Sequence, residues 1–221
     1  ANIVAVGHRI VQGGKYFDGP ALITDEVRDL IDELCALAPL HNPAHLKGID
    51  VARELMPDTP HVAVFDTAFF QRLPEETATY ALKQEVAEKY AVRRYGAHGT
   101  SHRYVTQRAG EFLNMKPEDH RFITCHIGNG ASISAVDHGK CIDTSMGLTP
   151  LEGLMMGTRT GDIDASAILY IMEREHQTLE EAVNLLNKES GVLGITEMSS
   201  DMRIIDDAAM AGNKRAQLAL D

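Results

Sequence analysis

Hydrophobic and polar positions along the chain alternate between two periods, the two-residue spacing of strands and the wider spacing of amphipathic helices. In residues 24–37 the apolar side chains fall at i, i+3, i+4 and i+7, which predicts a helix with Thr24 as its N-cap. In residues 131–136 apolar and small polar residues alternate and a turn follows at residues 137–139, which predicts a hairpin. The two patterns together indicate an α/β fold.

The same reasoning divides the rest of the chain into short strands and longer helices. Strands are expected over residues 3–6, 61–65, 121–127, 131–136 and 141–144, and helices over residues 24–37, 42–56, 75–90, 101–114, 165–173 and 179–188. Ser101 is expected to cap its helix, and Gly191 and Gly194 to interrupt the helical pattern. Because a hairpin lies beside helical crossovers, the sheets should be mixed. We expect two α/β parts, residues 1–116 and 117–221.

The composition is that of an ordinary globular protein, with 44% hydrophobic and 24% charged residues among 221. No run of about 18 apolar residues predicts a membrane span, and the first residues lack a signal-peptide pattern. The three cysteines have no metal or redox spacing, so we expect reduced, buried, structural thiols and a cytoplasmic protein. A net charge of −11, no Trp and no basic cluster argue against nucleic-acid binding.

The segment His126-Ile127-Gly128-Asn129-Gly130 places glycines between two predicted strands. P-loops and dinucleotide fingerprints need a glycine loop that opens a helix, so both are excluded. Glycines between strands allow backbone N–H groups to approach an anion, and Asn129 and Ser132 offer further donors. A plain glycine turn would contain the same residues, so the segment by itself leaves both interpretations open.

Longer blocks around this segment point to a known family. The run from Ile123 to Gly139, with its His, Gly, Gly and Ser at fixed spacing, resembles the internal signature of acetate and butyrate kinases. Further blocks that resemble the acetokinase family span residues 7–11, 38–45, 64–69, 94–102, 143–153 and 156–164. The resemblance covers nearly the whole chain but only the middle of the longer family sequences.

This resemblance implies an actin-like, ribonuclease H-like kinase fold of two α/β domains with mixed sheets, present here as an incomplete central portion. It implies reversible phosphoryl transfer from ATP to acetate, giving acetyl phosphate and ADP, a step toward acetyl-CoA. The implied cofactor is Mg²⁺ or Mn²⁺. Family members are commonly cytoplasmic homodimers, with no nucleic-acid or membrane partner.

Three residues are catalytic by this resemblance. Arg159 would stabilise the transferring phosphoryl group, and His98 would donate a hydrogen bond to it rather than act as a nucleophile. Asp66 would organise charge and metal, at most through water, because no other metal ligand is implied in this chain. Proton abstraction by Asp66 is not needed, since a carboxylic acid is already ionised near pH 7.

The remaining implied residues bind the two substrates. Acetate would contact Arg9, Val11, Leu40, His41 and Pro150, with Arg9 on its carboxylate. Ala97 stands where some family members have a bulkier Phe, which would favour propionate as an alternative substrate. The nucleotide would contact His126, Ile127, Gly128, Asn129, Gly130, Asp201, Met202 and Arg203, although Asp201 could equally be a helix cap.

Two rival interpretations deserve weight. The pairs His41/His45 and His98/His102 have the i, i+4 spacing of zinc hydrolases, but neither contains the Glu of that motif. The second rival is a catalytically inactive fragment or binding module, because segments of the family that contact ATP and Mg²⁺ have no counterpart in these residues.

Overall fold

The structure is a computed structural model that describes residues 2–39 and 41–221. The chain forms two compact units. The first unit runs up to Cys125 and also contains Ile133–Thr149, and the second contains His126–Ser132 and Pro150–Asp221. These units do not divide the chain at residue 116. The predicted division at that residue refers to the domains of the family, and it stays a prediction.

The first unit contains a three-stranded mixed sheet. Strands β1 (Val6–Ile10) and β3 (His61–Phe65) are parallel, and the short β2 (Ala21–Leu22) is antiparallel to β3. Ile10 pairs with Phe65, so both strands end at the same edge of the sheet. The residues that follow them therefore meet at this edge.

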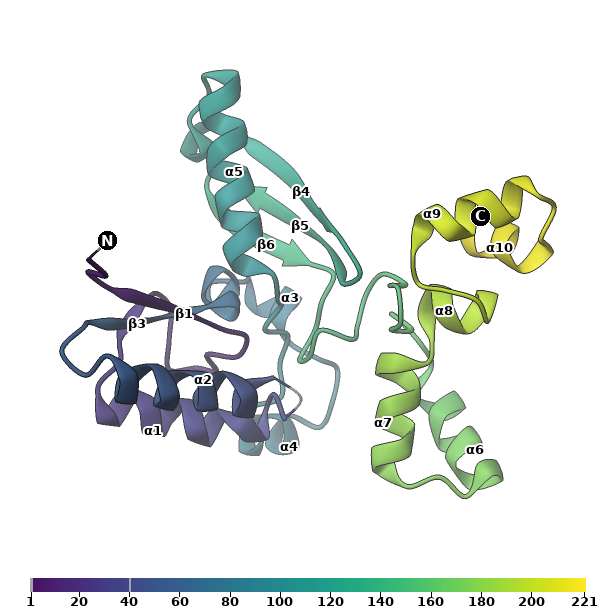
Figure 1. Ribbon diagram of the computed structural model, residues 1–221, viewed down its shortest axis with the longest axis horizontal. Coiled ribbons are helices and arrows are strands. Elements are labelled where there is room, and N and C mark those ends of the chain that lie inside the picture. Colours follow the sequence, from purple (N-terminus) through teal and green to yellow (C-terminus); the bar gives the residue numbers. More distant parts are fainter. Residues whose placement is uncertain (1, 40) are drawn as a thin grey trace. The chain divides into compact units, whose positions relative to one another are not determined.

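Two helices cover one face of this sheet (Figure 1), α1 (Asp25–Glu33) and α2 (Asn42–Leu55), with the 3-10 helix η1 (Leu34–Ala36) between them. Thr24 caps α1 by accepting the Val27 N–H, as predicted. The buried cluster beneath the helices is apolar throughout, and its members are Ile10, Phe17, Ile23, Ile31, Leu34, Leu46, Ile49, Ala63 and Phe65. Its burial is the main force that holds the helices on the sheet.

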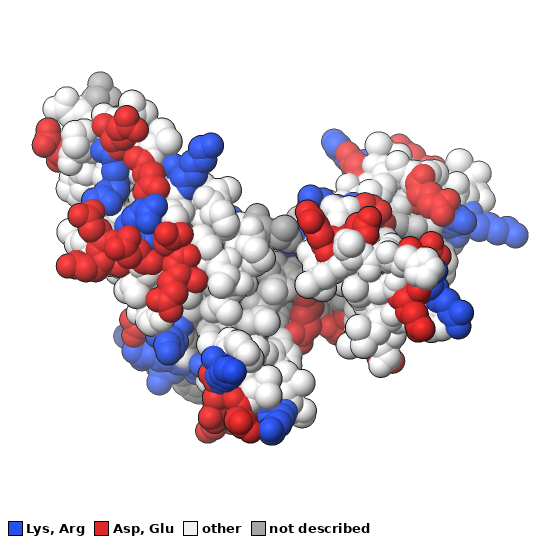
Figure 2. Space-filling view, turned by 90° about the horizontal axis from the view of Figure 1, so that it is seen from below, with Lys and Arg blue, Asp and Glu red and all other residues white. Residues whose placement is uncertain are grey.

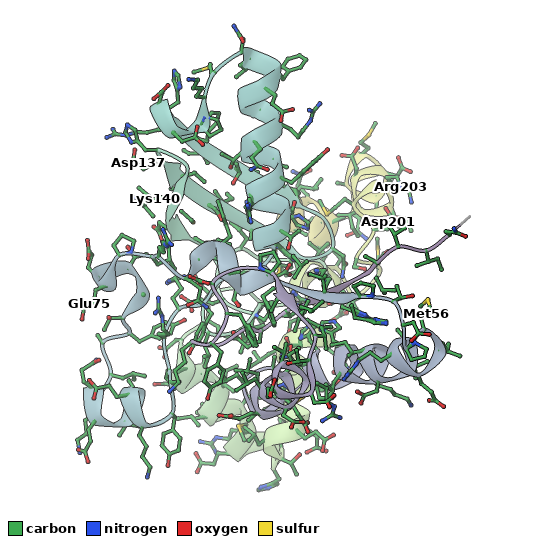
Figure 3. All side chains as sticks on the ribbon, turned by 90° about the vertical axis from the view of Figure 1, so that its left-hand side faces the viewer. Met56, Glu75, Asp137, Lys140, Asp201 and Arg203 are labelled. Atoms are coloured by element: carbon green, nitrogen blue, oxygen red, sulfur yellow. The ribbon has the colours of Figure 1, made fainter. Side chains whose placement is uncertain are left out.

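A second sheet is formed by β4 (Arg121–Ile127), β5 (Ala131–Asp137) and β6 (Lys140–Thr144), in that order. Asp137 pairs with Lys140 at the predicted hairpin turn (Figure 3). The long helix α5 (Gly99–Leu113) lies against the sheet, where His102 Nδ1 and Thr124 Oγ1 are 2.7 Å apart. Short helices complete the unit: η2 (Asp66–Phe70), α3 (Glu75–Ala78), α4 (Gln84–Lys89) and η3 (Pro117–Asp119).

The second unit is mainly helical. It contains α6 (Ala165–Glu175), α7 (Leu179–Lys188), α8 (Gly191–Thr196), α9 (Met202–Met210) and α10 (Lys214–Leu220). A small apolar core joins the last three helices through Val192, Ile205, Ala216 and Ala219. Thr178 and Glu181 form a capping box at the start of α7, which satisfies backbone donors that a helix leaves open.

Several predicted boundaries were wrong, each for a local reason. The first strand begins at Val6 instead of ending there, because its partner β3 pairs with Val6–Ile10. Helix α5 begins at Gly99 with His98 as N-cap, so Ser101 is not the cap. The helical stretch 75–90 divides at Thr79, which has an extended backbone. Gly191 and Gly194 start α8 rather than break it.

The prediction that the cysteines are buried holds for one residue only. Cys141 is 2% exposed, and burial raises the pKa of its thiol to about 12. Cys35 is half-buried, and all three cysteines are free thiols. Cys125 is exposed, because the alternation of β4 puts it on the same face as Ile123 and Ile127, which are 76% and 70% exposed.

Acidic and basic side chains are interspersed over the face shown in Figure 2. Within the first unit, Arg28 of α1 donates to Asp50 of α2 at 3.0 and 3.1 Å, which joins the two helices. Within residues 2–39 and 41–221, no helix has both the length and the apolar character of a membrane span.

Two stacked histidines predict a pH dependence of stability. His61 Nε2 lies 3.1 Å from the Met56 carbonyl, so this nitrogen carries the hydrogen in the neutral ring. His61 Nδ1 then accepts from His8 Nε2 at 2.9 Å. Burial, and secondarily the charge of His61, lower the pKa of His8 below 6.5. The unfolded chain binds a proton more readily, so stability is full above about pH 6.5 and falls below it.

Replacing His8 with Gln keeps a donor for His61 but removes the titrating group. The urea midpoint of His8→Gln should therefore fall less than that of the unsubstituted protein between pH 7 and pH 5.5. His120→Gln, outside this pair, serves as the control. Equal slopes for His8→Gln and the unsubstituted protein would contradict the assignment.

Candidate active site

Asp66 follows β3 at the edge where the parallel strands end, and it is completely buried. Arg9 of β1 meets it with two hydrogen bonds, from Nε to Oδ1 at 3.2 Å and from Nη2 to Oδ2 at 2.5 Å. Thr100 Oγ1 also donates to Oδ1, at 3.1 Å. A buried carboxylate needs such compensation, so this cluster fixes the position of the Asp66 side chain.

The guanidinium of Arg9 keeps part of its binding capacity. A guanidinium has five N–H donors along two edges, and Asp66 takes one edge. The side chain of Arg9 is 57% exposed, against 1% for Asp66, so the other edge faces outward. Arg9 can therefore receive a second carboxylate or phosphate without leaving Asp66.

His98 is held next to this cluster by a tightly packed segment. Its backbone is left-handed, with φ of 60°, which is rare for a residue other than glycine. A Cβ on Gly99 would overlap the Asp66 carbonyl oxygen, and one on Gly96 would lie 2.6 Å from the Phe70 ring. The glycines thus allow the His98 turn to lie directly on η2, the helix that begins with Asp66.

Of the predicted acetate contacts, Arg9, Val11 and His41 lie at or next to this edge, while Pro150 belongs to the second unit. Val11 is buried directly after β1, and His41 is the N-cap of α2. Ala97 is also buried, 2% exposed. Leu40 lies outside the described residues. Their role in binding acetate stays a prediction.

Sequence reasoning missed two neighbours of Asp66, namely Thr100 and His45. His45 lies in the first turn of α2, and its Nδ1 atom is buried without a hydrogen-bond partner among the described residues. Burial is the first cause that lowers the pKa of His45, followed by the charge of Arg9, while Asp66 acts in the opposite direction. His45 ends the family block 38–45, but its spacing from His41 suggested a metal pair instead of a neighbour of Asp66.

Arg159 is the central cation of the second unit. It is half-buried, Nη1 donates to the Pro150 carbonyl at 3.1 Å, and burial lowers the pKa of its guanidinium. No ion pair to an acidic side chain is found for it within the described part of the chain. The unit therefore brings Arg159 and Pro150 together, and leaves a partly desolvated positive charge uncompensated.

Three predicted segments converge on Gly157, two residues before Arg159. A Cβ on Gly157 would overlap Asn129 Oδ1 and would lie 3.2 Å from Ser200 Cβ. The Gly157 N–H donates to the Asn129 carbonyl at 3.0 Å. The glycine segment, the Arg159 loop and the segment before Asp201 thus pack against one another in one unit.

The Arg159 loop is also tied to α8. The Met156 carbonyl accepts from Val192 at 2.9 Å, and the Gly157 carbonyl accepts from Leu193 at 2.9 Å. Gly191 has a φ of +62°, and a side chain there would overlap the Met156 carbonyl. This glycine therefore starts a helix where the loop needs close backbone contact.

The predicted glycine segment lies at the end of β4. His126 and Ile127 are its last two residues, and Ile127 is exposed. The Gly128 N–H donates to the Gly130 carbonyl at 3.0 Å, which closes a tight turn. Asn129 is exposed at the tip of this turn. The turn interpretation is confirmed, and phosphate contact remains a prediction.

Asp201 and Arg203 form a local pair (Figure 3). Asp201 is the N-cap of α9, whose first residue is Met202, and Oδ1 accepts the Arg203 N–H at 3.0 Å. The side chain of Arg203 also bonds both carboxylate oxygens, and this pairing lowers the pKa of Asp201 to about 2. The helix-cap interpretation is confirmed, while a contact with the nucleotide stays a prediction.

The zinc-hydrolase rival gains nothing from the structure. Within residues 2–39 and 41–221 there is no group of three or more His, Cys, Asp or Glu side chains that could hold a metal. His102 is buried and faces Thr124 across 2.7 Å. The Asp66 oxygens are likewise occupied, by Arg9 and Thr100.

Comparison with known proteins decides the family. Residues 1–221 match the Acetokinase family along their whole length. The chain belongs to the acetokinase family. The acetate kinase of Thermoanaerobacterium thermosaccharolyticum is 57% identical over 222 residues, covering 100% of this chain and 56% of that relative. The acetate kinase of Treponema denticola is 57% identical over 219 residues, covering 99% of this chain and 55% of that relative.

Solved structures agree with this assignment. The acetate kinase of Porphyromonas gingivalis superposes with a TM-score of 0.93 at 52% identity, over 98% of this chain and 54% of that chain. A propionate kinase from Francisella tularensis gives 0.94 at 49% identity, over 98% and 56%. The predicted mixed α/β acetokinase fold is confirmed. The chain spans about half the length of the relatives it matches.

The close packing at Gly157 predicts that this member of the acetokinase family will not tolerate a side chain at this position without a loss of stability. Gly157→Ala should displace Asn129, because Asn129 Oδ1 occupies the space that a Cβ needs. We expect a loss of about 1–3 kcal/mol in the free energy of unfolding, measured by urea denaturation. Gly48→Ala is the matched control, since nothing lies within 4 Å of a Cβ there. A Gly157→Ala variant as stable as the parent would contradict the packing.

Proposed function

We propose that the full-length protein transfers the γ-phosphoryl group of ATP to acetate, forming acetyl phosphate and ADP reversibly. The observation that carries this proposal is Arg159, a half-buried guanidinium with no acidic partner in the described part of the chain. It lies on the loop where the glycine segment and the segment before Asp201 meet. Such a charge suits an anion that gains negative charge during reaction.

The proposed step is a direct in-line transfer. A carboxylate oxygen of acetate forms a bond to the γ-phosphorus as the bond to the β,γ-bridging oxygen breaks, and ADP leaves with that electron pair. Acetate is ionised near pH 7, so no proton needs to be removed. Arg159 and His98 would stabilise the charge on the transferring oxygens.

Arg9 supplies the proposed recognition of acetate. Its inner edge is fixed by Asp66, and its outer edge faces solvent with three N–H donors remaining. A carboxylate bound there would be aligned by two parallel hydrogen bonds. Asp66 would thus act by orienting Arg9, in addition to any water-mediated contact with a metal.

Mg²⁺ or Mn²⁺ is the cofactor that the family implies, bound with the phosphates of ATP. The described residues do not form a metal site by themselves, because no suitable group of three side chains is present among them. Both Asp66 oxygens accept hydrogen bonds, and we propose that any contact of Asp66 with the metal is made through water. We therefore assign no step of the reaction to a metal held by these residues.

Propionate is the second candidate substrate. Ala97 is small and 2% exposed, and a small side chain at the pocket would leave room for one more carbon. A relative of known structure at 49% identity is a propionate kinase. A homodimer in the cytoplasm stays a prediction, and an inactive fragment is the alternative if the protein proves no longer than these residues.

The direct test is an acyl hydroxamate assay on the full-length protein, with its intact mass measured first. Hydroxylamine traps the acyl phosphate made from ATP and acetate, propionate or butyrate. We expect acetate to give the highest kcat/KM and propionate the next. No hydroxamate from any of the three would reject the proposal.

Asp66→Asn tests the role of the buried charge. The amide keeps the shape but cannot accept both Arg9 donors as a carboxylate does, so Arg9 should lose its orientation. We expect kcat/KM for acetate to fall about 100-fold or more, with an altered Mg²⁺ dependence. Asp206→Asn, an exposed aspartate of α9, is the control. Unchanged turnover in Asp66→Asn would reject this role.

A further inference from the structure

The residue after His41 is a completely buried amide. Asn42 is 0% exposed, begins α2 and precedes Pro43. Water therefore cannot satisfy its side chain, and its polar atoms must find partners inside the protein. The partners it has connect two segments far apart along the chain.

The side chain of Asn42 binds both backbone groups of Gln12, its N–H and its carbonyl. The Gln12 N–H donates to Asn42 Oδ1 at 3.2 Å, and Asn42 Nδ2 donates to the Gln12 carbonyl at 3.0 Å. The amide thus pairs with the chain after β1 as a neighbouring strand would. Only one orientation of the amide satisfies both bonds, so the assignment of oxygen and nitrogen is fixed.

Other bonds in this loop lead to different elements. The Gly13 N–H donates to Thr67 Oγ1 at 2.9 Å, and Gln71 Nε2 donates to the Gly14 carbonyl at 2.5 Å. Both partners belong to η2 or directly follow it. Asn42 gives this loop two hydrogen bonds to the start of α2.

We propose that Asn42 is a positioning residue that determines acyl-chain specificity. It joins the backbone directly after Val11 to the residue directly after His41, and so fixes the separation of two walls of the acetate pocket. The inference rests on the proposed function, because that function makes Val11 and His41 pocket residues. Asn42 itself acts through them and does not touch substrate.

The physical reason is the small difference between the competing substrates. One methylene group in an apolar pocket is worth roughly a 10- to 200-fold discrimination, provided that the walls cannot move apart. Val11 is buried on a loop that is otherwise attached to η2. Loss of both Asn42 bonds would let the Val11 and His41 segments separate, and the pocket would accept propionate more readily.

The test replaces two amides that bind the same loop, residues 12–14, by carboxylates. Asn42→Asp sets an oxygen against the Gln12 carbonyl, and Gln71→Glu does the same against the Gly14 carbonyl. Asn42→Ser also removes the paired bonds but suits the start of a helix, so it decides the question if Asn42→Asp does not fold. All variants are made in the full-length protein and compared by thermal melting and steady-state kinetics.

We expect both Asn42 variants to raise KM for acetate about tenfold while KM for ATP changes less than about twofold. The acetate-over-propionate ratio of kcat/KM should fall about fivefold or more. Gln71→Glu should melt lower but keep the parent's ratio within about twofold. A purely structural role would lower stability and leave both the KM split and the substrate ratio unchanged.

The outcomes separate the two proposals. If the parent enzyme makes acetyl phosphate but the Asn42 variants keep its substrate ratio, the inference about Asn42 is wrong and the proposed function stands. An equal change of ratio in Gln71→Glu also overturns it, since any loosening of the loop would then suffice. If the parent makes no acyl phosphate, the proposed function fails and the inference fails with it.

Discussion

A buried charge has to be met by an opposite charge, and Asp66 imposes this constraint on the first unit. Its carboxylate is 0% exposed and would be strongly destabilising without Arg9. The parallel pairing of β1 with β3 brings Arg9 within reach, and the close approach at Gly99 delivers Thr100. One ion pair thereby connects a strand, the end of its neighbour and the start of a long helix.

Much of the fold follows from periodicity and capping. The helix after Thr24 and the strand His61–Phe65 lie where the apolar pattern puts them, since each depends on local residues and one buried face. The predicted boundaries were wrong where contacts between distant parts of the chain determine where a helix or strand begins. Helix α5 begins at Gly99, with His98 as its N-cap, because Gly99 meets a carbonyl on another element, and no local pattern contains that information. The first strand likewise takes its limits from its partner.

The candidate site divides in the same way. Family blocks predict Asp66 and Arg159 as site residues, because whole motifs are visible in sequence. The partners of these residues are not visible, since they come from elsewhere in the chain. Thr100 and Asn42 are 34 and 30 positions away from the groups they bind, and ordinary helix starts contain such residues without any further role. Whether such a residue also binds a distant group depends on the direction of its side chain, and the periodicity of the sequence does not contain that information.

The left-handed backbone of His98 sets stability against chemistry at one position. A non-glycine residue in that conformation costs roughly 1–3 kcal/mol, and glycine would relieve most of it. Under the role proposed for His98, selection for heat resistance alone would favour loss of this imidazole, whereas selection for turnover would keep it. Consensus or directed-evolution schemes that score thermal stability should hold this position constant, because under that proposal the more stable protein would be the poorer enzyme.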